Sequence, residues 1–302
     1  MNKILFVLGL IFLIGCKDDY DVELRSSDVS MLVVEGVLNA GQGPTTIRLT
    51  QSVSLQDPAQ VKPVTNAILT VENSGGSVYP LSPAGSGYYT HNQLPLVMGQ
   101  QYRLRIKTGS KEYLSDYVEA RPTPDIDSVT WSRDADGLKI FASTHDATNN
   151  TRYYKWDFDE TYEIRSFYSA MYQWLGDTTI VPTPAPHNYR CWKYDHSKTI
   201  IIGSSAQLQS DVISNFPVHF IPLGSEKLSY RYSILLRQQS LDKTAYQYFQ
   251  LMKKNTESLG SIFDPQPSEL KGNIRCITDP AEGVIGYLTA SEFKEKRIFI
   301  TA

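Results

Sequence analysis

Acidic residues alternate with aromatic residues between positions 156 and 163, and they are the first candidates for chemistry in this sequence. Asp157 and Asp159 are two positions apart, so on an extended strand both side chains point to one face. Two such carboxylates could hydrolyse a glycosidic bond or hold Ca²⁺ through their oxygens. Glu160 and Glu163 lie just beyond them. The same alternation is typical of a strand with one buried and one solvated face, and we expect the solvated face here.

A second group of residues has side chains that ligate zinc. His187, Cys191, Asp195 and His196 are spaced closely enough for a site if a helix aligned them. The prolines between positions 182 and 186 argue against such a helix. If Cys191 forms a disulfide, it is also unavailable as a thiolate ligand. We therefore expect no metal site.

Ser240 and Lys243 form a Ser-x-x-Lys motif, the arrangement in which penicillin-binding enzymes activate a serine nucleophile. Those enzymes need a Lys-Thr-Gly motif after the serine, whereas here it occurs before the serine, at positions 107–109. The Ser-Asp-Asn-like motif between the two is missing. Ser240 is better explained as the cap of a helix. We expect no catalytic residue, no cofactor and no enzymatic activity.

Cys16 has the surroundings of a cysteine that is modified by lipid. It follows Lys3 and a run of about eleven mainly apolar residues, 4–14, which is typical of a secretory signal. The run is too short to cross a hydrocarbon core of ~30 Å. It ends Leu-Ile-Gly-Cys and so matches the bacterial lipobox, in which the cysteine thiol is alkylated and the signal, here residues 1–15, is cleaved. We expect a membrane anchor of several acyl chains on Cys16.

The residues after Cys16 predict where the anchored chain is exported. Lys17-Asp18-Asp19 resembles the export signal that sends lipoproteins of Bacteroidota to the outer face of the outer membrane. The rest of residues 16–30 is acidic, rich in hydroxyl groups and poor in apolar residues, as in a flexible tether. We expect an outer-membrane protein that faces the cell exterior. An ordinary polar tether is the alternative.

Cys191 and Cys276 are the two cysteines that remain after Cys16. An even remainder in an oxidising compartment favours a disulfide between them, which we expect. Two free buried thiols are the alternative.

Composition excludes one large class of function. Lys and Arg number 29 against 32 Asp and Glu, for a net charge of −3, and the basic residues form no block. Nucleic-acid binding needs clustered Lys and Arg to displace counterions, so we do not expect it. The 19 Tyr, 11 Phe and 4 Trp are typical of a β-rich extracellular protein.

Hydrophobic periodicity predicts a mainly β chain in two parts. Residues 31–122 contain short apolar or alternating runs separated by Gly- and Pro-rich turns, as in an Ig-like β-sandwich. Residues 102–107 alternate most clearly, with three apolar and three basic side chains on opposite faces. The segment Arg121–Pro124 marks a domain boundary. Residues 123–302 form a second β-rich domain with one helix near 241–259, capped by Ser240 and closed by Gly260.

Four aromatic residues are the candidate contact with a ligand or partner. They lie in an irregular segment rich in aromatic residues and proline, at Phe167, Tyr168, Tyr172 and Trp174. If exposed, such rings could stack on a glycan or peptide, or dock on a receptor. The alternative, which we favour from the sequence, is a small core buried under a long loop.

Several stretches resemble the family designated domain of unknown function 4249, whose members are lipoproteins of Bacteroidota. The most specific are in the last hundred residues, Tyr232-Ser-Ile-Leu-Leu-Arg237, Glu257–Pro267, and Gly272-Asn-Ile-Arg-Cys276 before Gly286-Tyr287. The resemblance implies an N-terminal Ig-like or prealbumin-like sandwich. It also implies an outer-membrane lipoprotein, often encoded beside a TonB-dependent receptor. It implies no established activity.

Three functions follow as hypotheses. The first is a surface lipoprotein that captures a ligand as the accessory of a TonB-dependent transporter, with that outer-membrane β-barrel as partner. The second is a structural, adhesion or envelope-assembly lipoprotein without a ligand of its own. The third is a surface hydrolase, for which the sequence shows no positive sign.

Overall fold

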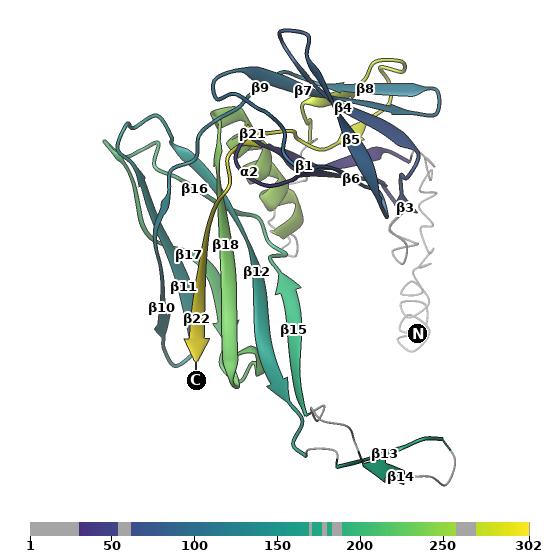
Figure 1. The fold of residues 1–302 in the computed structure, drawn as a ribbon. Coiled ribbons are helices and arrows are strands. Elements are labelled where there is room, and N and C mark those ends of the chain that lie inside the picture. Colours follow the sequence, from purple (N-terminus) through teal and green to yellow (C-terminus); the bar gives the residue numbers. More distant parts are fainter. Residues whose placement is uncertain are drawn as a thin grey trace, which may run out of the picture. The chain divides into compact units, whose positions relative to one another are not determined.

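The computed structural model describes residues 30–53, 62–168, 171–176, 180–182, 189–257 and 270–301 of the chain. Residues 31–302 form one compact unit. The expected signal of residues 1–15, the lipidation site Cys16 and most of the tether lie outside the described residues, as does Gly260. The predicted fold class is confirmed, because strands dominate and one helix is inserted among them (Figure 1).

The first sandwich is a continuous path of strands around one core. Its path runs β19-β8-β7-β4-β5-β6-β2-β1-β20, with β3, β9 and β21 attached at the side. The strand β5 pairs with β4 through its first half and with β6 through its second half, so the path turns over the core. The strands are β1 (Leu32–Asn39), β2 (Thr45–Gln51), β3 (Lys62–Pro63), β4 (Ala67–Asn73), β5 (Val78–Gly85), β6 (Tyr88–His91), β7 (Gln101–Thr108), β8 (Lys111–Ser115), β9 (Val118–Glu119), β19 (Ile274–Cys276), β20 (Val284–Ile285) and β21 (Ala290–Ser291).

Apolar and basic side chains alternate along β7, and the apolar ones face this core, as the sequence predicts. Tyr102, Leu104 and Ile106 are buried in the core, because side chains two residues apart on a strand share one face. The basic residues between them point outward, where Arg103 and Arg105 both bind the carboxylate of Glu72 on β4. Hydrogen bonds from these two guanidinium groups outweigh the effect of burial and lower the pKa of Glu72.

The C-terminal segment crosses the domain boundary expected at residue 122. Strand β19 pairs with β8, and β20 and β21 pair in parallel with β1. Ile274, Cys276 and Leu288 are buried in the first core as a result. The expected division into residues 31–122 and 123–302 therefore has to be corrected. The first sandwich is completed by residues that lie more than 150 positions after residue 122 in the chain.

Two glycines allow this returning segment to fit. A Cβ on Gly272 would lie 1.8 Å from the carbonyl oxygen of Gly286, and one on Gly286 would lie 2.4 Å from that of Val34. Gly286 also has a φ of +148°, which L-residues rarely adopt.

The substitution Gly286→Ala is expected to lower the free energy of unfolding by about 2 kcal/mol, through backbone strain and the clash with Val34. Urea denaturation measures the change. Gly76→Ala is the matched control, because Gly76 has a φ of +90° but a Cβ there would meet nothing within 4 Å. A loss at position 286 no larger than that at position 76 would contradict the role of close packing.

The second sandwich has two facing sheets, β10-β11-β17 and β15-β12-β18-β22, with β16 also paired to β12. Alternate residues of β12, among them Tyr154, Trp156 and Phe158, fill the core between them. A separate hairpin, β13-β14, extends past the ends of β12 and β15 (Figure 1). The strands are β10 (Ile126–Arg133), β11 (Gly137–Asp146), β12 (Tyr153–Arg165), β13 (Tyr172–Trp174), β14 (Ile180–Pro182), β15 (Arg190–His196), β16 (Ile201–Ser204), β17 (Asp211–Pro222), β18 (Arg231–Leu241) and β22 (Lys294–Thr301), with the short helix η1 (Glu226–Leu228) before β18.

The predicted helix is present as α2 (Lys243–Glu257). It begins one residue after Asp242, whose Oδ1 accepts a hydrogen bond of 2.7 Å from the backbone N–H of Ala245. Asp242 is therefore the cap, and the assignment of Ser240 to that role was wrong. Ser240 is buried in β18, where its hydroxyl donates to the Pro122 carbonyl. Within the described part of the chain, no helix is long and apolar enough to cross a bilayer.

Candidate functional site

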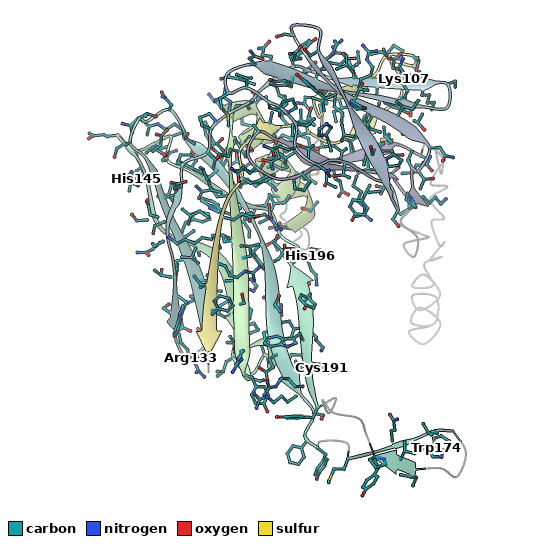
Figure 2. The ribbon with its side chains drawn as sticks, viewed as in Figure 1. Lys107, Arg133, His145, Trp174, Cys191 and His196 are labelled. Atoms are coloured by element: carbon teal, nitrogen blue, oxygen red, sulfur yellow. The ribbon has the colours of Figure 1, made fainter. Side chains whose placement is uncertain are left out.

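The four aromatic residues singled out in the sequence are exposed on and beside the β13-β14 hairpin. The exposed fractions are 90% for Phe167, 79% for Tyr168, 62% for Tyr172 and 69% for Trp174. None of the four belongs to a hydrophobic core formed by the described residues. Trp174 lies on the hairpin, well away from the two facing sheets (Figure 2). The expectation of a small core beneath a long loop was therefore wrong.

Two further exposed rings follow the hairpin in the chain, on β15. Trp192 and Tyr194 are 45% and 77% exposed. They are opposite Glu163 and Thr161 of β12, so both point to the outer face of the five-stranded sheet. Sequence reasoning missed them because the segment before residue 194 was read as irregular. The alternation Arg190-Cys-Trp192-Lys-Tyr194 was the signal that could have found this strand.

A cluster of arginines lies beside these rings on the same face. Arg165 and Arg190 are directly opposite each other in the sheet, which would be unfavourable for like charges alone. The buried carboxylate of Glu163 accepts from Arg165 at 2.6 Å and lies 3.0 Å from Arg190. Arg231 is 3.7 Å from its other oxygen. The hydrogen bond from Arg165 is the main cause that lowers the pKa of Glu163.

The arginine cluster leaves positive charge on the surface. Three guanidinium groups surround one carboxylate, for a net charge of +2 within the cluster. We name the six exposed rings and these arginines the hairpin surface; it comprises Phe167, Tyr168, Tyr172, Trp174, Trp192, Tyr194, Arg165, Arg190 and Arg231. Exposed aromatic and arginine side chains are the residue types that dominate binding energy in protein interfaces.

The carboxylates Asp157 and Asp159 lie on one outer face of β12, as their spacing predicts. Arg237, on the neighbouring strand β18, donates to both, with distances of 2.7 Å from Nε to Asp157 and 2.6 Å from Nη1 to Asp159. These two ion pairs raise the pKa of Arg237 against the opposing effect of burial. Both carboxylates thus accept hydrogen bonds in one ion cluster with Arg237.

The zinc hypothesis finds no support among the described residues. Asp195 and His196 are neighbours on a strand and so point to opposite faces. Asp195 instead binds Lys198 and Lys227. His187 lies outside the described residues. In the part of the chain that the structure describes, no three His, Cys, Asp or Glu side chains are grouped for a metal.

The disulfide expected between Cys191 and Cys276 is not formed. Both thiols are free, Cys191 exposed and Cys276 buried. Cys276 is opposite Tyr113 in the first sandwich, and Cys191 is opposite Ile164 near the hairpin end of β15 in the second (Figure 2). A disulfide requires Cα atoms within about 7 Å, and these strands belong to different sheets. The strand topology therefore separates the two thiols.

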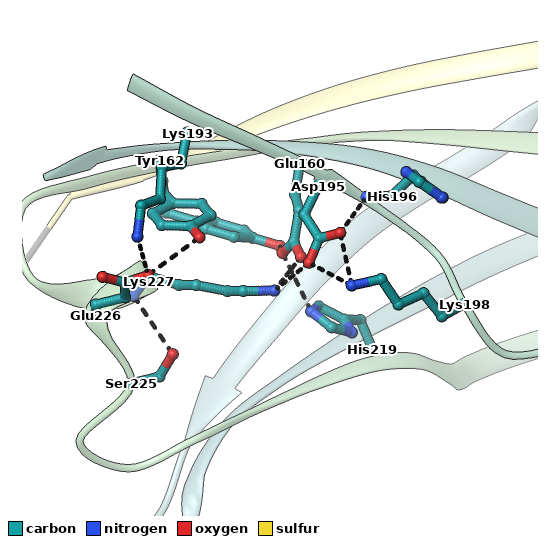
Figure 3. Close-up of polar contacts among 11 residues, drawn as sticks. Glu160, Tyr162, Lys193, Asp195, His196, Lys198, His219, Ser225, Glu226 and Lys227 are labelled. Atoms are coloured by element: carbon teal, nitrogen blue, oxygen red, sulfur yellow. Dashed lines mark hydrogen bonds and ion pairs between the residues drawn. The ribbon is translucent and has the colours of Figure 1, made fainter. Parts of the chain in front are cut away.

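Glu160, the third acid of the β12 pattern, points into the second sandwich (Figure 3). Its side chain is 1% exposed and accepts hydrogen bonds from Lys227 and, at 2.7 Å, from the hydroxyl of Tyr232. His219 Nε2 lies 3.3 Å from the same carboxylate. Burial would raise the pKa of Glu160, but these partners lower it below its ordinary value. Glu160 is therefore a buried member of an ion cluster in the second sandwich and is not part of the hairpin surface.

Two sandwiches and one exposed surface of aromatic and arginine side chains thus characterise this mainly β protein. Residues 17–297 match the family model described as "Domain of unknown function (DUF4249)". The chain belongs to this family, as its resemblance predicted. A comparison with curated proteins found no match.

Proposed function

We propose that this protein is a lipoprotein, anchored through Cys16 to the outer face of an outer membrane, where it serves as the ligand-capturing accessory of a TonB-dependent transporter. The lipobox supports a lipid anchor on Cys16, and the acidic residues that follow support export to the outer face of the membrane. The exposed aromatic and arginine side chains of the hairpin surface support the proposal that the protein binds a partner. In this proposal the protein binds and does not catalyse.

The exposed hairpin is the observation that carries the proposal. Tyr172 and Trp174 are more than half exposed on a two-stranded hairpin that pairs with no other strand among the described residues. Such a hairpin gains little stability by itself in water. Rings held out in this way supply large contact area with few rotatable bonds, which reduces the entropic cost of docking.

The charge of the hairpin surface specifies the chemistry of the partner. The cluster of Arg165, Arg190 and Arg231 has a net charge of +2 with Glu163 included. Arginine pairs with carboxylates in a bidentate geometry, so the partner should present acidic side chains around an apolar patch. We infer that the extracellular loops of the transporter provide this surface.

The double substitution Tyr172→Glu, Trp174→Glu is expected to reduce recovery of the transporter at least tenfold. The charged side chains would have to be desolvated against an apolar and acidic partner. The measurement is affinity purification of the tagged full-length protein from detergent-solubilised membranes at native expression, followed by mass spectrometry. The wild-type protein should recover a large β-barrel.

Ile68→Glu is the matched control, since Ile68 is 67% exposed on β4 of the first sandwich, outside the hairpin surface. It should leave recovery unchanged, and both variants should keep the wild-type melting temperature. If no barrel is recovered with the wild-type protein, the transporter partnership is wrong. If deletion of the gene then weakens the envelope without affecting nutrient uptake, the structural role is the better explanation.

A further inference from the structure

A large cleft lies among β1, β12 and α2. Its volume is about 1270 Å³, above the ~300–1,000 Å³ typical of small-molecule sites. Its lining also includes residues 196–200, the segment 285–287 and the start of β22. None of the exposed rings of the hairpin surface lines it, so it is a separate site.

Lys155 supplies a cation to this cleft. It lies on the outer face of β12, opposite Gln239 of β18 and Ile202 of β16. Among the described residues, no carboxylate lies within ion-pair distance of its ammonium group. The charge of Asp157 acts to raise the pKa of Lys155 against the effect of burial, but the carboxylate of Asp157 is paired with Arg237. The ammonium group is 5.3 Å from the ring centroid of Phe249. Burial lowers the pKa of Lys155, and an oxyanion beside it would favour the charged form again.

Gln239 supplies a second donor next to Lys155. Its side chain is 1% exposed and lines the same cleft. Its Oε1 accepts a long hydrogen bond of 3.5 Å from Ser291. Within the described residues its Nε2 has no hydrogen-bond partner. A buried amide N–H without an acceptor is unfavourable, so these two neighbouring donors could be satisfied by an acceptor that the described part of the chain does not provide.

Aromatic rings form the wall beside these donors. Tyr248 and Phe249 come from α2, and Tyr287 comes from the segment before β21. The ring centroids of Tyr248 and Tyr287 are 4.9 Å apart, and those of Tyr248 and Phe249 are 5.5 Å apart. Such a wall favours a ligand with a flat or cyclic body.

We propose that this cleft binds an organic acid with a ring-shaped body, whose oxyanion is held between the Lys155 ammonium and the Gln239 amide and whose ring packs on Phe249 and Tyr287. This site gives the proposed ligand capture its substrate class and rests on that function for its biological role. Binding itself can be measured on the purified protein without a transporter.

The test compares two dyes that share their ring system and differ in charge. Anilinonaphthalene sulfonate carries an oxyanion, and N-phenylnaphthylamine is its neutral counterpart. The protein is the chain from residue 30 onwards, because both sandwich cores lie within the compact unit 31–302. The background is Tyr172→Glu, Trp174→Glu, which removes two exposed rings that offer dyes a second apolar surface and disables the proposed docking. Lys155→Met should weaken sulfonate binding roughly tenfold or more and leave the neutral dye unchanged.

Lys198→Met is the matched control, because Lys198 also lines the cleft but is paired with Asp195 at 3.0 Å. It should change neither dye. Gln239→Glu is a second variant that keeps Lys155 and gives it an internal carboxylate; it should abolish binding of the sulfonate and not of the neutral dye. Equal binding of the sulfonate to the parent and Lys155→Met proteins, or equal weakening of both dyes, would overturn the proposal. Neither result would bear on recovery of the transporter.

Discussion

Replacing Glu160 by glutamine is expected to lower the free energy of unfolding by about 3 kcal/mol, at the low end of the ~3–5 kcal/mol observed when one member of a buried ion pair is removed. The carboxylate is almost fully buried and accepts from Lys227 and Tyr232. Its loss leaves Asp195, at 3.3 Å, as the remaining carboxylate partner of the Lys227 ammonium among the described residues. Urea denaturation at neutral pH measures the change.

The same substitution should alter the dependence of stability on pH. The partners of Glu160 lower its pKa in the folded protein below the ordinary value of 4.5. The unfolded chain therefore takes up a proton first as the pH falls, and stability decreases with it. The contribution of Glu160 is complete above about pH 5 and is lost as the pH falls through 4.5 towards the lower folded pKa. The Glu160→Gln protein should lack this part of the pH dependence.

Two further variants separate the buried charge from its surroundings. Glu226→Gln breaks a Glu-Lys pair with Lys193 whose members are both about half exposed, and it should have little effect. Glu160→Leu with Lys227→Met removes both charges, so it should be more stable than Glu160→Gln. A Glu160→Gln protein as stable as the wild type, with an unchanged pH profile, would show that the carboxylate does not stabilise the sandwich.

Replacing Cys16 by serine is expected to remove the protein from the membrane fraction entirely. Lipidation requires a thiol, and each buried methylene of an acyl chain contributes ~0.8 kcal/mol to membrane binding, so the loss of several chains leaves no anchor. Labelling with a radioactive or alkyne fatty acid, followed by membrane fractionation, measures both consequences in one experiment.

Cys191→Ser is the matched control for this experiment, because Cys191 is a free and exposed thiol in the folded domain. That protein should keep its label and its membrane association. Alanine at Lys17, Asp18 and Asp19 should keep the lipid and reduce the access of external protease, which separates the anchor from surface display. Retention of the Cys16→Ser protein in the membrane fraction would contradict lipid anchoring.

The strongest local patterns in the sequence predicted the structure well. The alternation in residues 102–107 gives a strand whose apolar face is buried and whose basic face binds Glu72. The apolar spacing near residues 241–259 gives a helix, observed as α2. These patterns succeed because the periods of strands and helices place alternate side chains on defined faces within one element.

Elements without a clear period were missed. Strand β5 contains Pro80 and Pro83 and buries only Leu81, so its sequence is typical of a turn. Strand β15 has mainly exposed residues, and its flanking prolines concealed the alternation. These two strands form through pairing with β4, β6 and β12, and pairing depends on residues that are distant in the sequence.

In the candidate sites, too, the sequence shows the residue types, whereas their positions depend on contacts between distant residues. Aromatic residues in the segment before Cys191 were identifiable by type, but their exposure depends on a hairpin that packs on no core of the described residues. In the sequence, Lys155 is one charged residue between Tyr154 and Trp156, and nothing in its type or spacing distinguishes it. Its position beside Gln239 and Phe249 requires β18 and α2, which lie more than 80 residues further along the chain. The prediction of a disulfide was wrong for the same reason. An even number of cysteines does not determine which strands are neighbours, and a disulfide forms only between cysteines that the fold brings close together.

By itself the amino-acid sequence determined the family, the mainly β class, the single described α-helix and the buried faces of the most regular strands. All of these are encoded in short segments, where side-chain type and period are sufficient. The tertiary structure decided that β19, β20 and β21 complete the first sandwich, that Glu160 is a buried ion-pair member, and that Lys155 and Gln239 present unmatched donors to one cleft. These features depend on contacts between residues far apart in the chain, and such contacts exist only when the strands have paired.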